Sequence, residues 1–235
     1  MTEASSYLTR GGVRVHRSVE PIDGAAAIDA LIAALDERRG ALFASSYEYP
    51  GRYTRWDMGF CDPPLVIVTC GREVRIEALN ERGGVLLAPI ARALEPLPAL
   101  AEFRAGTAAL HCRLREPEGR FAEEERSKQP SVFSVLRALV ELFRTDEDSH
   151  LGLYGAFGYD LAFQFEPLRL CLERPARQRD VVLFLPDELL LVDHRRELAT
   201  RQVDEDLELS GAGAAEGLGH DDPRRGAAGD VQDAP

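Results

Sequence analysis

The side chains best suited to ligand binding are concentrated in one stretch, residues 45–57. Ser45 and Ser46 end a short apolar run, and their hydroxyls could hydrogen-bond to the amino or carboxylate group of a small ligand. Residues 47–57 then supply three tyrosines, two arginines and the only tryptophan, a composition typical of contact loops. Alternatively, the serines cap the backbone of their own strand end, and composition alone favours this structural interpretation.

No pattern in the sequence predicts catalysis. The motifs that mark serine nucleophiles, helical zinc sites and phosphate-binding loops are absent. Gly152, Gly155 and Gly158 are spaced by three residues, which differs from the dinucleotide-binding pattern and favours a strand with close backbone approach. The histidines are scattered, and the cysteines form no CxxC pair, which indicates reduced, mostly buried thiols. These are His16, His111, His150, His194, His220, Cys61, Cys70, Cys112 and Cys171.

The composition is that of a globular protein. Hydrophobic residues make up 45% of the 235, so the chain can bury a core without disulfides or a metal. The net charge of −12, from 40 acids and 28 bases, argues against nucleic-acid binding, which needs a basic footprint. No signal-peptide pattern is visible, and no apolar run approaches the ~20 residues that span a bilayer. We therefore expect a cytoplasmic protein that contacts neither nucleic acid nor a membrane.

An α+β fold must position these side chains, with a mostly antiparallel sheet and packed helices. Apolar residues at helical spacing predict helices over residues 21–39, 86–94 and 132–143, the last capped by Ser131. Strands are predicted at residues 41–46, 65–70, 73–79, 108–114, 151–158, 181–185 and 189–193. Gly83 and Gly84 are expected to break the chain before the second helix. Because the strands pair along the chain in hairpins without a βαβ alternation, the class is α+β.

The end of the chain differs from the rest. Between residues 196 and 235, ten acids outnumber four arginines, which accounts for half of the net charge. Residues 211–235 contain only two larger apolar side chains, too few to offset the entropy of ordering the segment. We predict a folded domain over residues 1–194 and a low-order, acidic, Gly/Ala-rich tail over 195–235. The acidic run 204–206 is expected to be solvated and to bind no Mg²⁺.

Several stretches in a fixed order resemble a known family. Residues 47–57, followed by Asp-Pro-Pro-Leu at 62–65, are similar to the N-terminal region of anthranilate synthase component I. The similarity is closest to the form that is fused to its glutamine amidotransferase. The stretches 9–13, 131–137, 155–161 and 185–188 agree in order and spacing, so the resemblance covers about residues 7–194. Aminodeoxychorismate synthase is the nearest alternative, but the string 47–57 favours anthranilate synthase.

The resemblance implies a tryptophan feedback site and no catalytic centre in this chain. In this family the region supplies serine contacts to bound tryptophan, which makes Ser45 the first and Ser46 the second expected ligand residue. Leu42 or Phe43 would face the indole. The family converts chorismate and an ammonia donor into anthranilate and pyruvate with Mg²⁺, but the Mg²⁺ carboxylates belong to a C-terminal half that nothing here matches. We therefore expect no catalytic, metal or cofactor residue. The implied partners are tryptophan, a catalytic half and a glutamine amidotransferase.

Residues 195–235 are expected to resemble none of the family. This suggests a truncated, catalytically inactive N-terminal domain with an out-of-register or aberrant terminus. Two other functions stay open. One is a stand-alone regulatory module that binds an aromatic amino acid. The other is a non-functional fragment whose normally covered surface is exposed.

Overall fold

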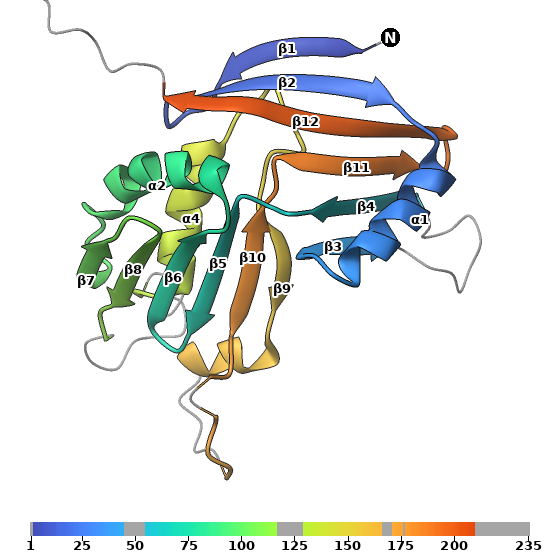
Figure 1. The fold of residues 1–235 in the computed structure, drawn as a ribbon. Helices are drawn as coiled ribbons and strands as arrows, with labels where there is room; N and C mark the ends of the chain where they lie inside the picture. Colours follow the sequence, from blue (N-terminus) through green and yellow to red (C-terminus); the bar gives the residue numbers. More distant parts are fainter. Residues whose placement is uncertain (1, 45–54, 117–128, 166–170, 176, 210–235) are drawn as a thin grey trace, which may run out of the picture.

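The fold is known from a computed structural model, which describes residues 2–44, 55–116, 129–165, 171–175 and 177–209. Within these residues the chain forms two antiparallel six-stranded sheets with helices packed on them (Figure 1). The predicted α+β class is confirmed. The strands of one sheet run across those of the other, so the sheets meet at a corner.

Sheet A has the strand order β1-β2-β12-β11-β4-β3. Its strands are β1 (Glu3–Leu8), β2 (Val13–Pro21), β3 (Gly40–Ala44), β4 (Trp56–Cys61), β11 (Glu188–Asp193) and β12 (Leu198–Leu209). Helix α1 (Gly24–Leu35) packs across β3, β4 and β11, and its own residue Leu31 is buried. The helix starts at Asp23 because this carboxylate accepts hydrogen bonds from the N–H groups of Ala25 and Ala26, at 3.1 and 3.2 Å.

Sheet B has the strand order β7-β8-β6-β5-β10-β9 and holds most of the core. Its strands are β5 (Leu65–Cys70), β6 (Glu73–Ala78), β7 (Leu100–Ala105), β8 (Ala109–Leu114), β9 (Tyr154–Phe157) and β10 (Val181–Leu185). Helices α2 (Glu81–Leu94) and α4 (Val132–Phe143) contribute their apolar faces to this core, and a short 3₁₀ helix, η1 (Tyr159–Gln164), follows β9. Most of the apolar stripe predicted for residues 132–143 lies on the buried face of α4, with Ser131 at its N-cap position, but Val140 is exposed.

The chain passes between the sheets at two neighbouring crossings. β4 continues into β5 through Asp62, and β10 continues into β11 through Asp187. These crossings lie side by side because β4 pairs with β11 and β5 pairs with β10. Arg82, in the first turn of α2, holds both: its Nε lies 2.6 Å from the Asp187 carboxylate and its Nη2 3.3 Å from the Asp62 carbonyl. Burial raises the pKa of Asp187, while the charge of Arg82 opposes this shift.

The turn between β1 and β2 closes the end of helix α4. The N–H groups of Arg10 and Gly11 donate to the carbonyls of Arg144 and Leu142, at 2.8 and 3.0 Å. The last carbonyls of a helix have no partner within the helix, so these bonds satisfy two of them. The stretch 9–13, which carries part of the family resemblance, therefore serves the fold.

Several local expectations are wrong. Gly83 and Gly84 lie inside helix α2, which already starts after Asn80. A Cβ on Gly83 would lie 2.0 Å from the Pro64 carbonyl oxygen, so this glycine permits the close contact between the helix and the crossing. Strands β1, β2, β4 and β7 were not predicted, and β4 includes Trp56 and Asp57 of the expected contact loop. Among the thiols, only Cys112 is buried, where burial raises its pKa to about 11.

The expected tail is also wrong in its first part, because residues 198–209 form β12 in the middle of sheet A. Asp204 is buried and not solvated: it accepts a hydrogen bond from Arg17 Nε at 3.1 Å. Arg17 also contacts Asp148, whose side chain is fully buried, and the Tyr7 hydroxyl. The charge of Arg17 thus compensates two buried carboxylates, which makes an acidic strand compatible with a protein interior. Residues 210–235 lie outside the described residues.

Candidate functional site

Strand β3 carries the predicted tryptophan-contact segment at the free edge of sheet A. Leu42 pairs with Gly59 of β4, where an added Cβ would lie 3.2 Å from Leu42 Cδ1 and 2.3 Å from Leu31 Cδ2. Leu42 therefore lies on the face that α1 covers. Phe43 points to the opposite face because side chains alternate along a strand. The two residues proposed for the indole thus belong to different surfaces, and only one can face it.

Phe43 joins an aromatic cluster in the corner between the sheets. Its ring centroid lies 6.4 Å from those of Phe60 and Tyr154, and Phe60 lies 5.7 Å from Phe184. Such tilted ring pairs stabilise the corner beyond their buried area. The Tyr154 hydroxyl donates to the His150 carbonyl at 2.5 Å, and burial raises the pKa of Tyr154 to about 12. Phe43 remains 39% exposed, so the cluster offers an apolar wall to solvent beside β3.

Charged residues surround the end of β3 where the serines follow. Ser45 and Ser46 lie outside the described residues, but Ala44 pairs with Asp57 of β4. Asp57 Oδ2 lies 2.8 Å from Nε2 of His194. The contact joins the start of β4 to the residue after β11. His194 was among the histidines judged to be scattered, because nothing in the sequence shows which residues lie beside it.

A second ion pair lies next to the first. Arg55 contacts Asp193 at 3.2 Å and stacks over the Trp56 ring at 4.9 Å. Although burial opposes it, hydrogen bonds from Arg55 and from the N–H groups of Arg195 and Arg196 lower the pKa of Asp193. The end of β3 therefore lies beside a fixed set of charges that could orient an amino acid's ammonium and carboxylate groups.

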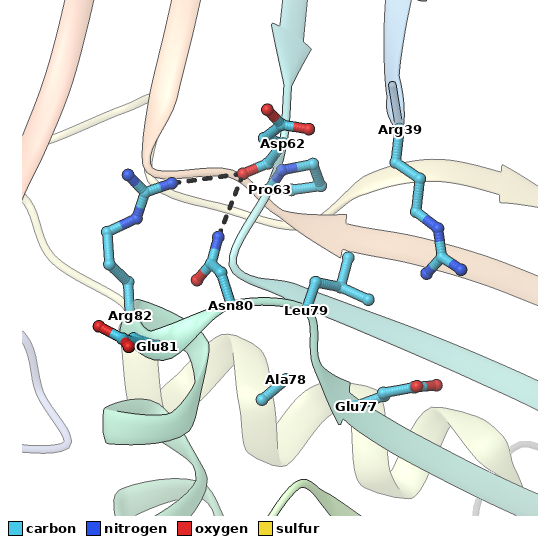
Figure 2. Close-up of a pocket in the computed structure, with 9 residues that line it drawn as sticks. All are labelled: Arg39, Asp62, Pro63, Glu77, Ala78, Leu79, Asn80, Glu81 and Arg82. Atoms are coloured by element: carbon cyan, nitrogen blue, oxygen red, sulfur yellow. Dashed lines mark hydrogen bonds between the residues drawn. The ribbon is translucent and has the colours of Figure 1, made fainter. Parts of the chain in front are cut away.

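A separate cavity of about 710 Å³ lies at the crossing from β4 to β5 (Figure 2). Asn80 and Arg82 both point to the Asp62 carbonyl, and Arg39 reaches the cavity from the opposite side. Asp62 also pairs with Arg38, and Glu77 lies 3.4 Å from Arg75. The cavity lining therefore carries charges of both signs, and most of them pair with neighbouring side chains. Leu42 is not part of it, so we assign the cavity to the crossing and not to the predicted ligand site.

Across the described ranges, no group of three or more His, Cys, Asp and Glu side chains comes close enough together to hold a metal ion. No helix in this part of the chain is long and apolar enough to cross a membrane.

Comparison with known proteins identifies the family of this chain. The chain is 48% identical over 228 residues to a protein of Azospirillum brasilense named anthranilate synthase, a match that covers 96% of this chain. The chain is a homologue of anthranilate synthase. It is also 34% identical over 63% of its length to a Pseudomonas aeruginosa protein named anthranilate synthase component 1, pyocyanine specific, and 29% identical over 71% to the Vibrio cholerae component 1. No protein-family model matches the chain.

The chain spans about a third of these anthranilate synthases, covering 31%, 27% and 31% of their lengths. The 96% coverage leaves only about nine residues of this chain unmatched, fewer than the segment 195–235 contains. The expectation that this segment resembles none of the family is therefore wrong. The sequence match extends beyond residue 194, and so does the fold of this chain, through strand β12.

Proposed function

We propose that this chain acts in tryptophan biosynthesis as part of an anthranilate synthase, in which it forms one wall of a tryptophan feedback site. The 48% identity over almost the whole chain is the observation that carries this proposal. In the complete enzyme, chorismate and ammonia or glutamine would give anthranilate and pyruvate. Mg²⁺ and the reacting groups would be held by residues outside this chain. We propose the cytoplasm as its location.

The surroundings of β3 support a site for an aromatic amino acid. The exposed side of Phe43 and the α1-facing side chain of Leu42 offer apolar surfaces on the two faces of one edge strand. The Asp57–His194 pair lies beside the strand's last residue, Ala44. We propose that Ser45 and Ser46, which follow Ala44, contact the ammonium or carboxylate group, while Leu42 contacts the indole.

Calorimetric titration with L-tryptophan tests this site. We expect weak or no heat with the chain alone, because the rest of the pocket would come from the catalytic part. Together with a polypeptide that supplies the unmatched part of the Azospirillum relative, we expect tryptophan to bind and to inhibit anthranilate formation. Ser45→Ala should weaken inhibition by tryptophan about tenfold. The control Ser6→Ala changes an exposed serine on β1 and should leave the inhibition unchanged.

The titration and an assay of anthranilate formation together separate the competing functions. Tight tryptophan binding by the chain alone would favour a stand-alone regulatory module. Anthranilate formation by the chain alone would contradict the proposal that catalysis lies outside it. If the combined enzyme is active but equally sensitive to tryptophan with Ser45→Ala, then the serine contact is wrong.

A further inference from the structure

The four edge strands of the two sheets differ in how they are protected. At one end, β1 carries Glu3, and β7 carries Glu102 and Arg104, which pair with each other at 2.8 Å. Charges on an edge strand oppose pairing with another chain. At the other end, β3 (Gly-Ala-Leu-Phe-Ala) and β9 (Tyr-Gly-Ala-Phe) contain no charged residue and no proline. Within the described residues, neither strand has a second neighbour.

The two unprotected edges lie together. The rings of Phe43 in β3 and Tyr154 in β9 are 6.4 Å apart, and Figure 1 shows the strands side by side at the corner of the sheets. Ala44 and Ala156 are exposed, and Phe157 is 54% exposed. The two uncharged edges therefore meet at Phe43 and Tyr154, and both strands carry exposed apolar side chains.

A mostly apolar cavity lies next to Phe157 of β9. It measures about 520 Å³ and lies between α4 and the strands β9 and β10, with Phe133, Val140 and Phe157 in its lining. Phe133 stacks on Phe157 at 6.0 Å, and Val140 of α4 is 54% exposed. Exposed apolar surface next to open strand edges is typical of a protein contact.

We propose that β3 and β9 together form a strand-addition surface, on which an extended, apolar segment from the rest of an anthranilate synthase pairs. The length of the relatives argues for this occupant, because about two thirds of each lies outside its match to this chain. Backbone hydrogen bonds to the free edges would supply affinity, and pockets for alternate side chains would supply specificity. The inference rests on the proposed function and names the surface through which the catalytic part docks.

The test uses the full chain and a polypeptide made from the part of the Azospirillum relative outside the match. Sedimentation should show a one-to-one complex, and hydrogen exchange should show slower exchange of β3 and β9 amides on mixing. The double variant Ala44→Lys/Ala156→Lys places charges on both edges and should raise the Kd at least tenfold. Val85→Lys, at a residue of α2 that is 55% exposed, is the matched control and should change it less than twofold. Circular dichroism confirms that each variant is folded.

Each outcome decides between the two proposals. A complex that both variants form with wild-type affinity overturns the docking surface but leaves the tryptophan site intact. A complex that depends on the edges but does not bind tryptophan supports the surface and contradicts the feedback site. Self-association of the chain, with β3 and β9 protected without the second polypeptide, assigns the edges to another copy and overturns the proposed occupant, as does the absence of any complex.

Discussion

Replacing Arg17 with methionine should destabilise the fold strongly. Arg17 is only 9% exposed and lies between Asp148 and Asp204, whose side chains are 0% and 4% exposed. Met has a similar length but no charge, so Arg17→Met leaves two carboxylates in the interior without their cation. Removing one partner of a buried ion pair costs about 3–5 kcal/mol, and two carboxylates lose their partner here.

The assay is urea unfolding followed by circular dichroism. With an m-value of about 2 kcal/mol per molar urea, a loss of about 4 kcal/mol lowers the unfolding midpoint by about 2 M. Arg14→Met, an exposed position on the same strand, is the control and should change stability by less than about 0.5 kcal/mol. An equal effect of the two substitutions would refute the account of Arg17.

The pH dependence gives a second, independent check. Burial raises the pKa of Asp204, whereas Arg17 opposes this shift, so the folded Arg17→Met protein should hold a proton there more tightly than wild type. Because the folded state then binds more protons than the unfolded state, its stability should rise as pH falls, by about 1.4 kcal/mol per pH unit and proton. The deficit relative to wild type should therefore be smaller at pH 5 than at pH 8. A pH-independent deficit would contradict buried carboxylates as its cause.

Two further predictions concern the corner between the sheets. Gly83→Ala should destabilise the protein by about 2 kcal/mol or more, because the new Cβ meets the Pro64 carbonyl, whereas Gly84→Ala, in open space, should stabilise helix α2 by about 0.5–1 kcal/mol. Thermal unfolding of both variants checks the pair, and equal effects would contradict the contact. Phe60→Ala should cost about 3–5 kcal/mol in urea unfolding, because Phe60 is 2% exposed and contacts Phe184 in the aromatic cluster. A loss below 1 kcal/mol would show that the corner repacks.

The hairpin from residue 65 to 79 was predictable because its signals are local. Val74 and Ile76 alternate with charged residues, and Gly71 adopts the positive φ of 55° that its turn requires. Each strand also pairs with its neighbour in the chain, as the expected hairpins imply. The strand β12 was missed for the opposite reason. Its acidic residues resemble a solvated tail until Arg17, almost two hundred residues away, is known to lie beside Asp204.

The sequence marked only part of the candidate site, and the role of that site in tryptophan binding stays a prediction. The resemblance identified the segment around Leu42, Ser45 and Ser46, but the alternation of β3 separates Leu42 from Phe43. The pairs Asp57–His194 and Arg55–Asp193 join residues that are 137 and 138 positions apart in the sequence, so no local pattern marks them. Arg55 and Asp57 already belonged to the string 47–57, which was the one available signal.

The sequence by itself determined the α+β class, the hairpins, the helices with apolar stripes and the relation to anthranilate synthase. These properties depend on the period of apolar residues and on order along the chain, which neighbouring residues express directly. Only the tertiary structure decided how the hairpins join into two sheets, which edges remain unprotected among the described residues and how Asp204 of β12 becomes buried. Those features depend on the free energy of contacts between distant segments, which no local stretch of sequence contains.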